Sequence, residues 1–421
     1  MRSVKKNAAH VITKIQCLII VISDKTKISH PYTINNKKER KTTMKNVLTV
    51  LAAIAIFGLI ACEGPAGPAG KDGATGTAGR DAGFVYFDGF KADLKCSSCH
   101  NADTDTINNV AGRTIQWANS IHGSGTASEE NRSSCIECHS TEGFIKKVNG
   151  IGLTDIATVT PPGCFACHSP HSKGDFSLRT TATVSLTSNI TGVNASTFNV
   201  GKGNLCVACH RPRPITTSAT TMLPDPTKTA TTDTLKIASN RWYGHYGVQG
   251  QILSGAGAVQ FQGATYGSTT SHTTMAPLST DGCVGCHMAD YLPANAYGNK
   301  IGGHTMHVSY TPEGSTTAIE MLNGCKSCHT SITKLDYNSK ITTFKANMDT
   351  LKKLLVAKTW IDTLDAIKIP TTGDKVLKIV PASRGGALFN YMMLLHDGSH
   401  GIHNPTYSND VVRASIVELR K

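Results

Sequence analysis

Six short segments of this 421-residue chain share the pattern Cys-x-x-Cys-His, in which two thiols and one imidazole lie within five residues. This spacing is typical of c-type haem attachment, where the thiols form thioether bonds to the haem vinyl groups and the histidine ligates the iron. Chance would give far fewer than one such segment. The pattern predicts six covalently bound haem c groups, held by Cys96/Cys99/His100, Cys135/Cys138/His139, Cys164/Cys167/His168, Cys206/Cys209/His210, Cys283/Cys286/His287 and Cys325/Cys328/His329.

Two other uses of paired cysteines have to be weighed against haem attachment. Paired Cys-x-x-Cys segments can build structural zinc sites, but a zinc site does not require a histidine directly after the second cysteine. An exported protein can instead form disulfides. Six close pairs with the same trailing histidine would be an unusual disulfide framework, so haem is favoured over both.

The N-terminal part predicts export and lipid anchoring. Residues 44–61 have a lysine near their start, an apolar run and a small-residue end, which is typical of a secretory signal peptide. The end of this segment and Cys62 resemble the bacterial lipobox, which makes Cys62 the lipidated first mature residue; an ordinary cleavage site before an unmodified cysteine is the alternative. Residues 1–43 indicate a misassigned start, with Met44 as initiator. Glu63 favours the outer membrane, on either its periplasmic or its surface face.

A linker follows the anchor over residues 62–83. Glycine recurs at every third position from Gly64 to Gly79, as in collagen. A triple helix would imply a trimer, whereas a flexible stalk requires no partner and is the simpler interpretation.

Net charge excludes a nucleic-acid binder. The chain has a net charge of +13, but residues 1–61 contain eleven Lys or Arg and two Asp or Glu, which leaves about +4 for the rest. Two propionates on each haem would offset that remainder, and no basic stripe is visible.

The expected fold class is mainly α, with long irregular loops and few short strands, packed around haem. Residues 84–335 form the predicted hexahaem region, with a short helix at each motif and a strand over Leu178–Leu186. Because aromatic residues make up only 6%, the polypeptide alone is expected to build a thin core. Residues 336–421 form a helical C-terminal region, with helices around residues 341–355, 387–395 and 409–419 that pack on the core or, alternatively, on a second subunit.

Nine further histidines follow Cys62 and are candidates for the second axial position of the irons: His122, His171, His245, His272, His304, His307, His396, His400 and His403. Some lie in segments that resemble distal-ligand segments of the multihaem cytochrome c family. These segments are Trp117-x-x-Ser-x-His122, the Cys-His-x-Pro-His run ending at His171, and Gly401-x-His403-Asn-Pro, which resembles a C-terminal segment of nitrite-reductase-like members. The resemblance implies distal ligation by six residues: His122, His171, His245, His272, His304 and His403.

The remaining candidates have alternative roles. His307, His396 and His400 are alternates for which a surface role or a role beside the ligands is open. Met288 and Met306 could in principle ligate iron, although the supply of histidines makes this unnecessary.

Six irons with two histidine ligands each predict an electron carrier of anaerobic or extracellular respiration. Its expected partners are redox proteins such as other cytochromes, a quinol-linked donor or a terminal reductase, and oligomerisation is left open. The alternative is a reductase of nitrogen or sulfur oxyanions with one open haem, whose pocket could use Lys146, Lys147, Arg211 or Arg213. The Cys-x-x-Cys-Lys site of ammonia-forming nitrite reductases does not occur in the chain.

Overall fold

The computed structural model describes residues 86–87, 90–91, 94–105, 107–124, 131–191, 193, 196–291 and 297–421. The predicted upstream extension (1–43), the signal peptide (44–61), the lipidation site Cys62 and the linker (62–83) lie outside these residues. Residues Arg80–Lys421 form one compact unit. Among the helices that the structure describes, none has both the length and the apolar composition needed to span a membrane.

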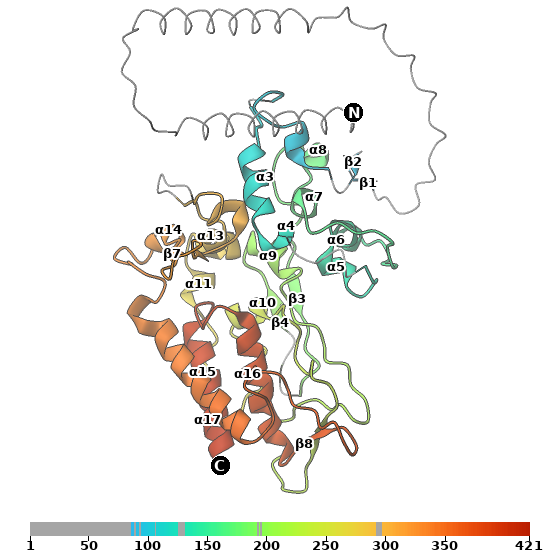
Figure 1. Cartoon of the computed structure of the whole chain (residues 1–421), viewed down its shortest axis with the longest axis vertical. Coiled ribbons are helices and arrows are strands. Elements are labelled where there is room, and N and C mark those ends of the chain that lie inside the picture. The colour runs from blue at the N-terminus through green and yellow to red at the C-terminus, as the bar shows by residue number, and fades with distance from the viewer. Residues whose placement is uncertain are drawn as a thin grey trace, which may run out of the picture. The chain divides into compact units, whose positions relative to one another are not determined.

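Most regular structure in the described part is helical, and long irregular segments join the elements (Figure 1), which confirms the predicted fold class. The strands form antiparallel pairs: β1 with β2 (Tyr86–Phe87, Phe90–Lys91), β3 with β4 (Val184–Leu186, Ser196–Phe198), β5 with β8 (Leu235–Ile237, Leu377–Ile379) and β6 with β7 (Ser309–Tyr310, Ile319–Glu320). The helices outside the Cys-x-x-Cys-His segments are α3 (Ala111–Ala118), α4 (Ile121–Ser124), α6 (Thr141–Val148), α8 (Pro170–Lys173), α10 (Gln249–Leu253), α11 (Ser271–Thr274), α12 (Leu278–Asp281), η3 (Gly303–Thr305), η4 (Tyr337–Ser339), α15 (Lys340–Ala357), η5 (Ala382–Arg384), α16 (Gly385–Asp397) and α17 (Pro405–Arg420).

A short helical turn lies within or overlaps each Cys-x-x-Cys-His segment, as predicted. In the segments of His100, His168 and His329, the histidine amide donates a hydrogen bond of 2.8 to 2.9 Å to the carbonyl of the first cysteine. This i to i−4 bond closes one turn, which places the imidazole near the first thiol. The six turns are η1 (Cys96–Ser98), α5 (Ile136–His139), α7 (Cys164–Cys167), α9 (Gly203–Val207), α13 (Cys283–His287) and α14 (Asn323–Lys326).

The predicted strand over Leu178–Leu186 is mostly wrong, because only Val184–Leu186 forms a strand. Arg179 explains the shortening, since its guanidinium donates hydrogen bonds to the carbonyls of Phe165 and His168 at 2.8 and 3.0 Å. The first part of the segment is therefore held against a Cys-x-x-Cys-His turn, while the buried Val184 and Leu186 continue into the pair with β4.

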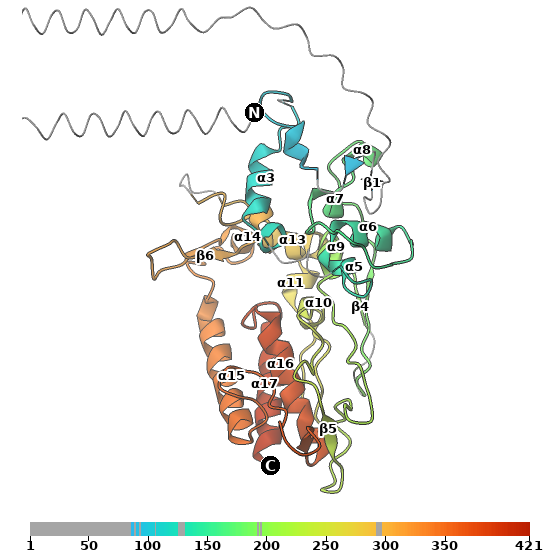
Figure 2. The same ribbon diagram turned by 45° about the vertical axis from the view of Figure 1, so that its right-hand side comes forward.

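The largest hydrophobic core lies at the C-terminal end, where α15, α16 and α17 pack side by side (Figures 1 and 2). All three predicted C-terminal helices are confirmed, and they pack on the chain's own core. Their partner is the long interval between the fourth and fifth motifs, which contributes Trp242, Ile252 and Val259, and whose β5 pairs with β8. The prediction of a thin polypeptide core is therefore wrong for this part of the chain, because apolar side chains from segments distant in sequence pack into one cluster. The clusters near the motifs are small.

Buried polar side chains fix how α16 and α17 sit on that interval. The Asn390 side chain accepts from the Val259 amide at 2.8 Å and donates to the Val259 carbonyl at 2.9 Å. The Tyr407 hydroxyl accepts from the Ala258 amide at 2.9 Å. Because an unpaired buried backbone group is costly, these bonds favour a single register between the helices and the loop.

We expect Leu351→Ala to lower the free energy of unfolding by about 3 kcal/mol, because Leu351 is fully buried in this core and the truncation leaves a cavity. Denaturant unfolding of the haem-loaded protein, followed by far-ultraviolet circular dichroism, measures the change. Lys345→Ala on the exposed face of the same helix is the control and should change stability little. Equal stability of the two variants would contradict the packing of α15.

Candidate haem-attachment sites

We number the attachment sites 1 to 6 in chain order, from Cys96/Cys99/His100 to Cys325/Cys328/His329. The structure sets each motif histidine opposite one of the six predicted distal histidines, with ring centroids 6.1 to 6.5 Å apart. The two histidines of each pair come from different segments of the chain. The pairs are His100–His171 (6.1 Å), His139–His245 (6.1 Å), His168–His304 (6.3 Å), His210–His122 (6.1 Å), His287–His403 (6.2 Å) and His329–His272 (6.5 Å).

This separation fits an iron held between two imidazoles. A metal–imidazole bond is about 2 Å long, and the bonding nitrogen lies about 1 Å from its ring centre, so two rings on opposite sides of one iron have centroids roughly 6 Å apart. The two rings of a pair are too far apart for face-to-face stacking. With two thiols beside each motif histidine, the residues present fit a covalently attached, doubly ligated haem.

Burial keeps several of these imidazoles neutral, which metal ligation requires. Desolvation and the neighbouring His210 lower the pKa of His122 to about 4. Desolvation, helped by His168, lowers the pKa of His304 to about 4 as well. The pKa values of His210, His272 and His287 are lowered mainly by burial. At neutral pH, these rings therefore keep a free nitrogen lone pair.

Hydrogen bonds to Nδ1 orient several rings. Backbone carbonyls accept from His168 (Phe176, 2.8 Å), His287 (Met306, 3.0 Å) and His272 (Ile402, 3.1 Å). Because Nδ1 carries the proton and donates a hydrogen bond to a carbonyl, Nε2 is the nitrogen that can bind a metal.

Gln249 orients His210 in the same way through its side chain. Its Oε1 accepts from His210 Nδ1 at 3.2 Å, while its Nε2 donates to the carbonyls of Tyr246 and His396 at 2.9 and 3.1 Å. The two donated bonds fix the amide orientation, so its oxygen faces His210.

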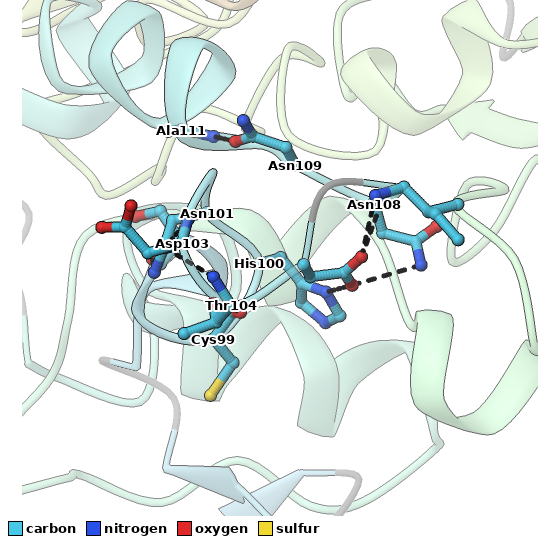
Figure 3. A network of polar contacts seen from close by, with 11 residues as sticks. Cys99, His100, Asn101, Asp103, Thr104, Asn108, Asn109 and Ala111 are labelled. Carbon is cyan, nitrogen blue, oxygen red and sulfur yellow. Dashed lines mark hydrogen bonds and ion pairs between the residues drawn. The ribbon is translucent and has the colours of Figure 1, made fainter.

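Site 1 has a carboxylate in this role; Figure 3 shows His100 and Asn108, which both donate to it. Asp105 accepts from His100 Nδ1 at 2.6 Å and from the backbone amides of Asn108 and Ile107 at 2.9 and 3.1 Å. These hydrogen bonds, led by that of Asn108, lower the pKa of Asp105 to about 2. The Asp105 carboxylate is partly exposed, so solvent screens its charge.

Helix α3 positions His304 on the far side of site 3. The Gln116 side chain donates to the Gly298 carbonyl at 2.7 Å and accepts from the His304 amide at 3.1 Å. The Trp117 indole donates to the Pro162 carbonyl at 2.9 Å, just before the turn of site 3. One helix thus holds both segments whose histidines face each other.

Met306 contacts two ligand candidates from different pairs. Its sulfur lies 2.9 Å from His122 Nδ1, and its carbonyl accepts from His287. Met306 has a left-handed φ of 60°, which turns its carbonyl and side chain toward these two rings. Both contacts are made at Nδ1, so Met306 does not occupy the Nε2 side of either ring.

The alternate histidines lie outside the six pairs. His307 Nδ1 is 3.1 Å from the Lys300 carbonyl. His396 packs its ring against Tyr243 and Tyr246, with centroids 4.3 and 4.5 Å away. Partial desolvation lowers the pKa of His400, although the residue as a whole is exposed.

Attachment sites contact one another through their cysteines. The pKa of Cys138 (site 2) is lowered by Cys209 (site 4), and that of Cys206 (site 4) by Cys283 (site 5). The thiols of Cys209 and Cys283 also lie 3.8 and 3.9 Å from the carbonyls of Glu137 and Gly203. Site 4 therefore neighbours both site 2 and site 5.

Further contacts extend this series to all six sites. Cys96 (site 1) lowers the pKa of Cys164 (site 3) to about 7. Cys167 of site 3 packs with Cys209 of site 4 in one small apolar cluster. Burial, with Cys325 and Cys328 of site 6 adding to it, raises the pKa of Cys286 (site 5) to about 11. Sites 1, 3, 4, 5 and 6 thus form a continuous series, and site 2 joins it at site 4.

Cys99 departs from most of the predicted attachment residues, because the structure leaves it exposed. Cys328 shares this exposure, whereas the other motif cysteines are buried or partly buried. Cys99 and Cys328 belong to sites 1 and 6, the two ends of the series, where a neighbouring site lies on one side only. The Thr104 hydroxyl donates to the carbonyl of Cys99, within the loop that Figure 3 shows. The thioether bonds of all twelve motif cysteines, Cys99 included, remain predictions from the motif.

Of the cations proposed for an oxyanion pocket, two are engaged in ion pairs. Lys147 and Arg211 both pair with Glu137, the latter at 3.5 Å. The single carboxylate of Glu137 offsets one of these two positive charges and holds both side chains beside site 2. In the residues that the structure describes, the twelve motif cysteines are free thiols, and no cluster of three or more His, Cys, Asp or Glu could hold a metal ion.

The residues that sequence reasoning missed are the Nδ1 acceptors Asp105, Gln249 and Asp397. Gln249 is 39 residues from His210, so no local pattern connects the two. Asp397 is only six residues from His403. A carboxylate close in sequence to a ligand histidine was the one signal that could have indicated Asp105 and Asp397.

No family model and no curated protein matches this chain. Among solved structures, it is similar to the crystal structure of the outer cell wall cytochrome OcwA, at 18% sequence identity and a TM-score of 0.41. The match covers 73% of this chain and 50% of that cytochrome, so it spans about half of that protein's own length. A likeness this distant does not support a shared function.

Covalent attachment can be counted by mass. We expect the intact protein, produced with a c-type haem maturation system, to gain the mass of six haems. Replacing Cys135 and Cys138 with serine should leave five, because site 2 loses both thioether bonds. The control is Cys62→Ser, which should keep six. A zinc-loaded or disulfide-bonded protein without added haem mass would contradict the assignment.

Proposed function

We propose that this chain is a hexahaem c-type cytochrome that carries electrons, with two histidines on every iron. The observation that carries the proposal is that all six motif histidines face a second histidine at a separation suited to one iron. When bound, the haems would supply one-electron transfer between ferric and ferrous iron. The polypeptide supplies the paired imidazoles and orients several of them through hydrogen bonds at Nδ1.

The contacts between attachment sites support a carrier. A carrier needs redox groups near one another, and the chain holds sites 1, 3, 4, 5 and 6 in a continuous series with site 2 beside site 4. Site 4 has three neighbours in this arrangement. We therefore propose that electrons can enter or leave through three arms, which end at sites 1, 2 and 6.

The proposed setting is the cell envelope. The signal peptide and lipobox-like sequence support attachment to the outer membrane through a lipid on Cys62, and the glycine-rich segment supports a flexible stalk. At the membrane surface, the chain would exchange electrons with other redox proteins, such as cytochromes, a quinol-linked donor or a terminal reductase. Respiration with a low-potential or extracellular acceptor suits irons with two histidine ligands.

The pairs favour a carrier over the alternative reductase. Oxyanion reduction needs an iron with an open position for the substrate and cations beside it. Each motif histidine faces a second imidazole, and Lys147 and Arg211 are paired with Glu137. The geometry therefore offers two histidine ligands at every site.

Carbon monoxide binding tests this proposal. We expect the dithionite-reduced wild-type protein to keep its Soret band unchanged when carbon monoxide is added, because each iron is closed by two imidazoles. His304→Ala should shift about one-sixth of the band, since it opens the iron of site 3 alone. His307→Ala, three residues along the chain, is the matched control and should show no shift.

The proposal fails if wild-type protein binds carbon monoxide at one or more irons without denaturant. In that case, nitrite, hydroxylamine and tetrathionate would be tested as substrates.

A further inference from the structure

Asp397 places a buried negative charge on one ligand candidate. Its Oδ1 lies 2.7 Å from Nδ1 of His403, the histidine that faces His287 of site 5. The Asp397 side chain is only 1% exposed. Burial opposes a charge on His403, yet the charge and hydrogen bond of Asp397 raise its pKa. A protonated Nδ1 that donates to Asp397 leaves Nε2 of His403 to face site 5.

The loop between α16 and α17 holds the two groups in this geometry. Asp397 is the last residue of α16, and the Ser399 hydroxyl donates to its other oxygen while also accepting from the His403 amide at 3.3 Å. Asn404 caps α17 and donates through its side chain to the Ser268 carbonyl at 2.9 Å. The loop is therefore fixed at both ends and in its middle.

Close packing leaves this loop little room to move. Gly401 has a left-handed φ of 86°, and a Cβ there would lie 2.9 Å from the Phe344 ring of α15. The loop thus rests directly on the C-terminal core. Asp397 and His403 keep their relative positions because the core keeps them.

The Asp397 contact differs from those at the other oriented rings. His168, His272 and His287 donate to backbone carbonyls, and His210 to an amide oxygen, all of them neutral acceptors. The other carboxylate acceptor in the described part of the chain is Asp105, which is 22% exposed. A buried charge is screened far less than an exposed one, so Asp397 acts more strongly on its ligand.

We infer that Asp397 is a positioning residue that lowers the reduction potential of the site 5 haem. This inference rests on the proposed function. A negative charge on the far nitrogen of a ligand makes the ligand more basic, which stabilises ferric iron relative to ferrous iron. Site 5 joins site 6 to the junction at site 4, so Asp397 sets the energy of electron transfer along that arm.

The test is potentiometric titration of Asp397→Asn, which removes the charge but keeps an oxygen that can accept from His403. We expect the equilibrium constant for reduction of one of the six haems to increase tenfold or more. For a one-electron couple, each tenfold increase raises the reduction potential by 59 mV. Asp105→Asn is the matched control. Because Asp105 is solvent-screened, its component should shift by a factor of about three or less.

A second variant tests the same inference in case Asp397→Asn does not fold. Ser399→Ala removes one hydrogen bond from the Asp397 carboxylate, which leaves more of its charge on His403. The same component should then move in the opposite direction, away from reduction. Unchanged potentials in both variants, each with six attached haems, would overturn the inference.

Carbon monoxide separates this failure from a failure of the proposed function. His403→Ala should open one iron to carbon monoxide in the reduced protein. If His403→Ala binds carbon monoxide but Asp397→Asn titrates like wild type, only the role of Asp397 is wrong. If His403→Ala binds none, His403 does not ligate iron and the proposed pairing at site 5 is wrong.

Discussion

The gap between facing imidazoles is the constraint on which the rest of this structure depends. Two rings whose centroids lie about 6 Å apart are beyond face-to-face stacking, and the polypeptide holds both at a distance that suits a metal between them. The motif side is fixed by one helical turn. The opposite side comes from another segment, such as η3 for His304, α11 for His272 or the loop before α17 for His403.

The C-terminal core does part of this positioning without carrying a motif of its own. Its helices pack on the interval between the fourth and fifth motifs, and this assembly carries His245 and His403. A packed core supplies rigid anchor points, whereas the apolar clusters that the structure describes in the attachment region are small. The two regions have different roles: one has the thiols and motif histidines, and the other holds two of the opposing histidines, His245 and His403.

Sequence reasoning succeeds where the signal is local. The motifs, their helical turns and the apolar periodicity of α15 all depend on residues within a few positions of one another, and the structure contains these elements. The six distal candidates came from short segments that resemble a family, and their ligation remains a prediction. The pairing of His304 with His168, the core around Trp242 and the exposure of Cys99 depend on which distant segments meet. No local pattern encodes such contacts, which explains why the sequence could not predict them.

The central claim is that two histidines close each of six irons, and a spin count of the fully oxidised, haem-loaded protein tests it most directly. Two imidazoles impose a strong ligand field, so the account predicts that all ferric irons are low-spin and integrate to six per chain. Electron paramagnetic resonance supported by magnetic circular dichroism would measure this. A high-spin component equal to one-sixth or more of the iron would contradict the account, because it would show that at least one pair of facing histidines does not ligate.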